Sequence, residues 1–143
     1  NKPLGATVTH TLDKGSSMHQ VDHGTPVAYT FTSARIQPSQ VIVTPAKNRQ
    51  IMAFIGLASL QEGSTEDEFH VTLRYRIGTG PWITLRKYEL EVMGSQHNDL
   101  RAILTLTTTP SSYIEFGMIT ERPGGTEVHI SNESNVSFDY WIN

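Results

Sequence analysis

The chain has 143 residues, of which 37% are apolar and 17% are charged, and it contains 17 Thr and 12 Ser. This length suits one domain with a sizeable core, and the many β-branched threonines favour strands. The net charge of −3, without any basic stripe, argues against nucleic acid as a partner.

Cysteine is absent, which excludes disulfides, thiolate metal sites and cysteine nucleophiles. No apolar run is long enough to cross a bilayer, so we expect no membrane insertion. The sequence begins at Asn1, with neither an initiator Met nor a signal peptide. We therefore expect it to be a processed piece of a longer protein.

The N-terminal part is polar and rich in Gly and Ser, and only Ala6–Leu12 suggests a short strand there. We interpret residues 1–26 as an extended N-terminal arm or the end of a stalk, and residues 27–143 as the head domain. Two short strands are expected early in the head, one beginning at Val27 and one covering Gln40–Pro45.

The stretch Ile51–Leu60, IMAFIGLASL, has no charged residue. A run of this length fits a helix or a strand buried on both faces. The period of two in the other periodic segments favours the strand. One face then carries Ile51, Ala53, Ile55 and Leu57, and the other carries Met52, Phe54, Ala58 and Leu60.

Apolar and polar residues alternate strictly along Phe69–Ile77, FHVTLRYRI, which indicates a strand with one wet face. A turn at 78–81 leads to a returning strand that begins at Trp82. The apolar phase of that strand slips at Arg86-Lys87, as a β-bulge would produce. Residues 93–99 are expected to form a loop.

The last third of the sequence also has period two. Strands are expected at Leu100–Thr107, Tyr113–Thr120, Glu127–Ile130 and Val136–Ile142. The sequence thus predicts about eight to ten short strands, at the spacing typical of a sandwich or barrel. No convincing helix is found.

From Arg49 onward, the order of these signals resembles the TNF/C1q-like jelly roll: a long apolar strand, a charged alternating hairpin, two strands joined by a short turn, and a last strand at the chain end. The resemblance implies an all-β fold, a two-sheet antiparallel jelly-roll sandwich that assembles as a homotrimer. The polar arm, the lack of Cys and the many Thr and Ser are similar to heads of viral spikes and fibres, including bacteriophage ones such as the trimeric vertex spike of tectiviruses.

If one face of the long apolar strand lines the core, its other face needs a cover. In TNF-like trimers a neighbouring subunit supplies that cover, and such interfaces resemble a domain core cut in two. We therefore expect a trimer interface that contains Met52, Phe54, Ala58, Leu60 and Trp141. The alternative is that the N-terminal arm covers the same surface within one subunit.

Two segments of the sequence carry side chains that could bind a metal ion. His19 and His23 flank Asp22, but Gly24 and Pro26 argue against the helix that would bring the two imidazoles together. The acidic segment Glu62–Glu68 offers oxygen ligands for Ca²⁺, yet its spacing matches no EF-hand. We expect no metal site, no cofactor and no catalytic residues, since no nucleophile elbow is present.

A ligand-contact group is expected on the charged hairpin. Trp82 follows Gly80-Pro81, where an exposed ring can stack on a sugar, and Arg74 and Arg76 can bind an anion. The alternative is a Trp folded back over the edge of the sandwich beside a solvated basic face.

These observations favour a non-enzymatic protein: the trimeric head of a viral, and specifically phage, spike or fibre on the virion surface. It would hold the spike trimer together and present loops for host attachment. Its partners would be copies of itself, other spike or vertex proteins and a host receptor or glycan. The alternative function is a lectin-like or cytokine-like trimeric binding module.

Overall fold

The computed structural model describes residues 2–3, 8–11, 19–21, 26–30, 36–61, 67–123, 128–130 and 135–142. The side chains within 2–21, 129–130 and 135–142, and those of Phe54, Leu60 and Asp67, lie outside the description. Among the residues described, no helix is long and apolar enough to cross a membrane.

The described chain is almost entirely β-structure, as the alternating sequence predicts. The strands are β1 (Lys2–Pro3), β2 (Val8–Thr11), β3 (His19–Val21), β4 (Val27–Thr30), β5 (Arg49–Gln61), β6 (Asp67–Ile77), β7 (Ile83–Val92), β8 (Gly94–Leu106), β9 (Ile114–Glu121), β10 (Val128–Ile130) and β11 (Asn135–Ile142). One short 3-10 helix, η1 (Pro38–Gln40), interrupts them.

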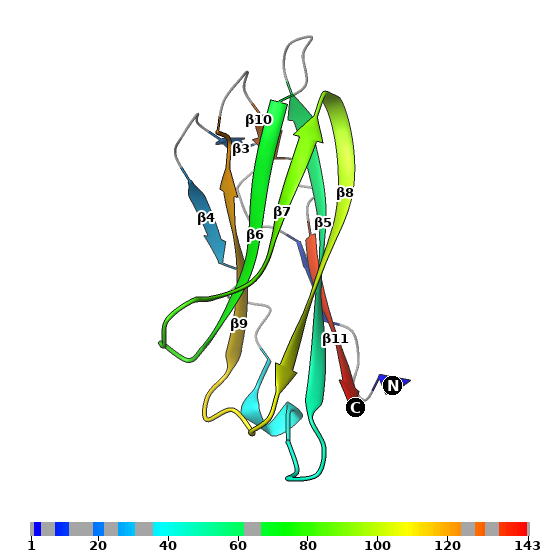
Figure 1. The fold of residues 1–143 in the computed structure, drawn as a ribbon, viewed down its shortest axis with the longest axis vertical. Coiled ribbons are helices and arrows are strands. Elements are labelled where there is room, and N and C mark those ends of the chain that lie inside the picture. Colours follow the sequence, from blue (N-terminus) through cyan, green and yellow to red (C-terminus); the bar gives the residue numbers. More distant parts are fainter. Residues whose placement is uncertain are drawn as a thin grey trace.

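Two antiparallel sheets form a sandwich (Figure 1). One sheet has four strands in the order β4-β9-β6-β7. The other has seven: β8 follows one side of β5 along its whole length, and β11 and β10 share the other side. The predicted all-β, two-sheet antiparallel fold is therefore confirmed.

The core lies between the sheets and comes from one face of each long strand. In β5 the buried set is the expected one, Ile51, Ala53, Ile55 and Leu57. Tyr75 and Ile77 of the alternating face of β6 are partly buried against the core. The other alternating residues of β6, β8 and β9 are buried: Phe69, Val71, Leu73, Leu100, Ala102, Leu104, Leu106, Ile114, Phe116 and Met118. A hydrophobic period of two thus identified the inward faces correctly.

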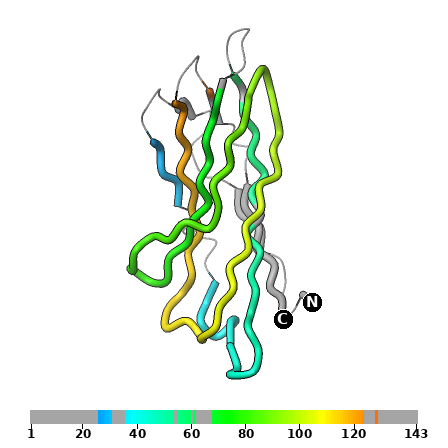
Figure 2. The backbone as a smooth tube through the Cα atoms, in the orientation of Figure 1, coloured from blue at the N-terminus to red at the C-terminus, as the bar shows by residue number. Residues whose placement is uncertain are grey.

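The phase slip in the returning strand is a β-bulge. Leu73 lies opposite Arg86 and Arg74 lies opposite Thr84, so Leu85 is an extra residue in β7. The turn before it projects sideways from the body of the sandwich (Figure 2). The bulge restores the inward direction of the apolar residues after it, among them Val92.

Two local predictions were wrong. The loop expected at 93–99 is the first half of β8, because Gly94 turns the chain with a φ of 74° and the residues after it pair with the end of β5. The strand expected at Gln40–Pro45 is absent. Val41 is instead a buried anchor after η1, and the Val43 amide donates to Thr109 Oγ1 at 2.8 Å.

The described parts of the N-terminal arm pair with the seven-stranded sheet. β1 and β2 lie beside β11, with Val8 opposite Phe138, and β3 lies beside β10. The short strand suggested within Ala6–Leu12 corresponds to β2. The division into an arm at 1–26 and a head at 27–143 stays a prediction.

Candidate functional site

The seven-stranded sheet has apolar side chains on the face that points away from the core. Met52 of β5 lies directly opposite Ile103 of β8. Met52 is half-buried, and Ile103 is 56% exposed. Ile103 and Met52 thus form a small apolar patch on the outward face of the seven-stranded sheet.

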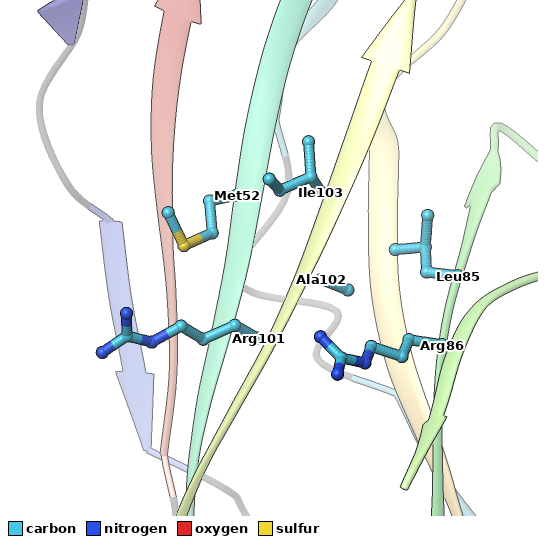
Figure 3. Close-up of a pocket in the computed structure, with 6 residues that line it drawn as sticks. All are labelled: Met52, Leu85, Arg86, Arg101, Ala102 and Ile103. Atoms are coloured by element: carbon cyan, nitrogen blue, oxygen red, sulfur yellow. The ribbon is translucent and has the colours of Figure 1, made fainter.

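A hollow of about 430 Å³ lies next to this pair along the β8 edge (Figure 3). Leu85 and Arg86 reach it from β7, and the others belong to β5 and β8. Its lining residues are Met52, Leu85, Arg86, Arg101, Ala102 and Ile103. Four of its six lining residues are therefore apolar, and the other two are arginines.

The structure describes the side chains of only some of the residues predicted to form the trimer interface. Met52 and Ala58 are half-buried within one chain. The side chains of Phe54, Leu60 and Trp141 lie outside the described residues. The backbone register places Trp141 opposite Gln50, so the last strand runs beside the strand that carries Met52.

The edges of the two sheets meet at the side of the sandwich where this hollow opens. The Tyr88 hydroxyl donates to the Arg101 carbonyl at 2.6 Å and accepts from the Arg101 amide at 2.9 Å. Arg86 lies 4.5 Å from the centre of the Tyr88 ring. One tyrosine thus satisfies both backbone groups of an edge-strand residue, which otherwise need water or a partner strand.

The predicted ligand-contact group is gathered in one place on the outer face of the four-stranded sheet. The Arg74 and Arg76 guanidinium carbons lie 4.4 Å and 4.6 Å from the centre of the Trp82 ring. Trp82 also lies against Gly117 of β9. Trp82 is half-buried, and its ring rests on the four-stranded sheet.

Beneath this group lies a buried carboxylate that the sequence analysis missed. Glu115 is fully buried, and its Oε1 accepts from Arg76 Nε at 2.7 Å. Burial, and then the charge of Arg76, lowers the pKa of the Arg74 guanidinium. Arg74 Nε has no hydrogen-bond partner among the described residues. An anion would supply that partner, but ligand contact by these residues stays a prediction.

A second cluster lies on the same outer face. Glu68, His70 and Glu89 each offer a ligand atom, and these atoms lie within 4.8 Å of one another. Sequence reasoning considered Glu68 only as the end of an acidic segment. The signal that could have found the site is the pair Glu68 and His70, two residues apart on the wet face of a predicted strand.

The metal ligands considered from the sequence lie elsewhere. The side chains of His19, Asp22 and His23, and those of residues 62–67, are outside the described residues. Those two interpretations are therefore not tested.

The sandwich and its strand order define a jelly roll, the class that the sequence resembles. A chain from the structure of infectious bursal disease virus, Gx strain, is similar, with a TM-score of 0.53 and 13% identity over 94% of this chain. This chain spans 32% of the length of that virus chain. Eiger TNF from S. frugiperda is also similar, with a TM-score of 0.53 and 10% identity, covering 96% of this chain and 92% of that one.

A weaker likeness, with a TM-score of 0.39 and 12% identity, is to the CBM22-1 xylan-binding domain of Xyn10C from Paenibacillus barcinonensis. It covers 95% of this chain and 96% of that domain. No protein-family model matches the sequence, and no curated protein is a recognisable relative. The two likenesses with a TM-score of 0.53 thus agree with the jelly-roll fold.

Proposed function

We propose that this chain is the head domain of a trimeric viral spike or fibre, of the kind found at a bacteriophage vertex. Its work is assembly: three sandwiches pack around one axis and hold the chains of the spike together. Its loops then face a host surface or another spike protein. The domain has no catalytic activity in this proposal, and it is located on the virion surface.

The observation that carries the proposal is the apolar outer face at Met52 and Ile103. A single sandwich hides its inward residues, but Ile103 remains 56% exposed and lies beside the hollow of about 430 Å³. Burying one large apolar side chain contributes roughly 1.5–3 kcal/mol. Several such side chains in each subunit are enough to stabilise an obligate oligomer.

The sequence extends the same surface. Phe54, Ala58, Leu60 and Trp141 belong to the interface in this proposal, although only Ala58 has a described side chain. The polar arm, the absence of Cys and the many Thr and Ser support a spike over a cytokine. The jelly roll shared with a virus chain and with a TNF chain is a fold that suits either.

The test is the solution mass of the full chain by sedimentation equilibrium at micromolar concentration. We expect three times the 15.9 kDa of one chain. Ile103→Glu should dissociate the trimer, because it places a charge in a dry contact. Ile83→Glu is the matched control, since Ile83 is 47% exposed but belongs to β7 of the other sheet.

A wild-type monomer or dimer would contradict the proposal. Equal dissociation of both variants would contradict the location of the interface.

The second candidate is a lectin-like or cytokine-like binding module, and the group of Trp82, Arg74 and Arg76 favours it. An indole beside two guanidinium groups suits a sugar that carries a carboxylate or a sulfate. A glycan array probed with wild type and with Trp82→Ala separates the two functions. Binding that is lost in the variant supports the lectin, and a tight trimer without any glycan supports the spike head.

A further inference from the structure

The cluster at Glu68, His70 and Glu89 arises from the register of β6 and β7. Glu89 lies directly opposite His70, and Glu68 precedes His70 by two residues on the same strand face. Their ligand atoms converge to within 4.8 Å of one another. Two strands of a rigid sheet therefore hold a nitrogen and two carboxylates around one point.

The imidazole of His70 lies between two carboxylates. Nε2 of His70 lies 2.7 Å from Glu68 Oε1. On its other side, Nδ1 lies 3.6 Å from Oε1 of Glu121, which belongs to β9 and lies opposite His70 in the register. If Nδ1 donated a hydrogen bond to this carboxylate, the contact would fix the tautomer that leaves Nε2 free to bind a metal.

His70 is also poorly satisfied as it stands. Its side chain is 12% exposed, and Nδ1 is buried with no hydrogen-bond partner among the described residues. A buried ring nitrogen normally has a partner. A small shift that brings Nδ1 and Glu121 together would supply one, and a metal on Nε2 would favour that shift.

The glutamates around His70 give this part of the sheet a negative charge that a bound cation would neutralise. A fourth glutamate, Glu91, lies directly opposite Glu68, and like charges opposite each other destabilise a sheet. Within the described residues, no lysine or arginine lies within ion-pair distance of these carboxylates: Glu68, Glu89, Glu91 and Glu121.

We propose that Glu68, His70 and Glu89 bind a divalent transition-metal ion. Glu121 orients the imidazole of His70 in this site, and Zn²⁺ is the ion used to test it. The nitrogen ligand selects Zn²⁺ and similar ions over Ca²⁺ and Mg²⁺, which prefer oxygen alone. Nε2 and the Glu68 oxygen would move apart to about 3.3 Å, the separation of two ligands on a tetrahedral ion. The bound ion would link β6 to β7.

The experiment is calorimetric titration of the full chain with ZnCl₂. We expect one high-affinity site per chain. The dissociation constant for Zn²⁺ should rise by at least about tenfold in the ligand variants His70→Ala and Glu89→Gln. It should rise by about tenfold in Glu121→Gln, which lacks only the orienting carboxylate. The matched control is His97→Ala. His97 Nε2 also lies close to a carboxylate, 3.1 Å from Asp99 Oδ1, but both side chains are more than half exposed on β8. That variant should bind Zn²⁺ as wild type does.

Replacing Zn²⁺ by Co²⁺ gives an independent result, since its visible absorption reports imidazole and carboxylate coordination. Wild type should show this band, and Glu89→Gln should lose it, while circular dichroism confirms that each variant is folded. The proposal is overturned if wild type binds no Zn²⁺, if Ca²⁺ binds equally well, or if His97→Ala weakens binding as much as Glu89→Gln does.

Discussion

Trp82 packs over Gly117 at a point where any side chain would collide with the neighbouring strand. A Cβ at position 117 would lie 2.6 Å from the Tyr29 carbonyl oxygen and 3.3 Å from the indole. The missing side chain leaves room for the indole against β9, and the guanidinium carbons of Arg74 and Arg76 lie within 4.6 Å of the centre of its ring. A glycine on β9 thus explains why the hairpin's tryptophan folds back.

Gly117→Ala should destabilise the protein by about 1–3 kcal/mol, the usual effect of overpacking a tight site. The backbone oxygen of Tyr29 cannot move aside as a side-chain end can, so most of the loss should persist in a Trp82→Ala background. Urea denaturation of wild type, the two single variants and the double variant gives these free energies. A loss that disappears when Trp82 is removed would mean that the indole, and not the strand, is the obstacle.

Arg76 should matter more to stability than Arg74, although both lie over the same indole. Arg76→Met removes the guanidinium 2.7 Å from a fully buried carboxylate, and breaking such a pair typically costs about 3 kcal/mol. Arg74→Met loses a cation–π contact and relieves a desolvated charge, so its net effect should be within about 1 kcal/mol. Chemical denaturation of both variants tests the order, and equal losses would show that Glu115 does not depend on Arg76.

Tyr88→Phe should loosen the junction between the two sheet edges. The hydroxyl makes two hydrogen bonds with the Arg101 backbone, so its loss should destabilise the fold by about 1–2 kcal/mol. Exchange of the Arg101 amide hydrogen, measured by NMR, should become faster in the variant. Tyr75→Phe serves as the control, because the Tyr75 hydroxyl makes no hydrogen bond with any of the residues that the structure describes. Unchanged exchange at Arg101 would show that water replaces the tyrosine without loss.

The Tyr29 phenol should make stability fall in alkali. Burial raises its pKa above the ordinary value, against a smaller lowering by the hydrogen bond with Thr120. The folded state therefore holds the proton longer than the unfolded chain, whose tyrosines ionise at about pH 10. Stability from this group is present below that pH and is lost as the pH rises above it.

The measurement for Tyr29 is the free energy of unfolding from pH 8 to pH 11, in wild type, Tyr29→Phe and Tyr75→Phe. The alkaline decline should be shallower in Tyr29→Phe only. In wild type, the Tyr29 phenol should stay protonated, by ultraviolet absorbance, until the protein unfolds. Identical slopes in all three proteins would contradict the assignment.

Alternation predicted the strands whose two faces differ. Phe69, Val71 and Leu73 are buried while His70 and Arg74 face outward, and the phase slip near Arg86 is a bulge at Leu85. Alternation failed where a strand is polar on both faces. Residues 95–99 carry no apolar signal, and they form a strand because β5 extends far enough to pair with them.

For each candidate site, the sequence could predict only which residues of one strand share a face. Arg74 and Arg76 share a face by their spacing, and so do Glu68 and His70. Their partners Glu115, Glu89 and Glu121 come from other strands at positions set by register. A shift of one residue in that register would turn every side chain to the opposite face, and the local sequence of either strand does not specify it.

The sequence by itself determined an all-β sandwich and the inward face of its long strands, because burial of alternating apolar side chains follows from composition and spacing alone. Only the tertiary structure decided what the outward faces do. Pairing across strands brought a tryptophan against two arginines, buried a glutamate beside one of them and placed carboxylates around one histidine. These relationships depend on contacts between residues far apart in the chain, and the energies of such contacts exist only once the sheets have formed.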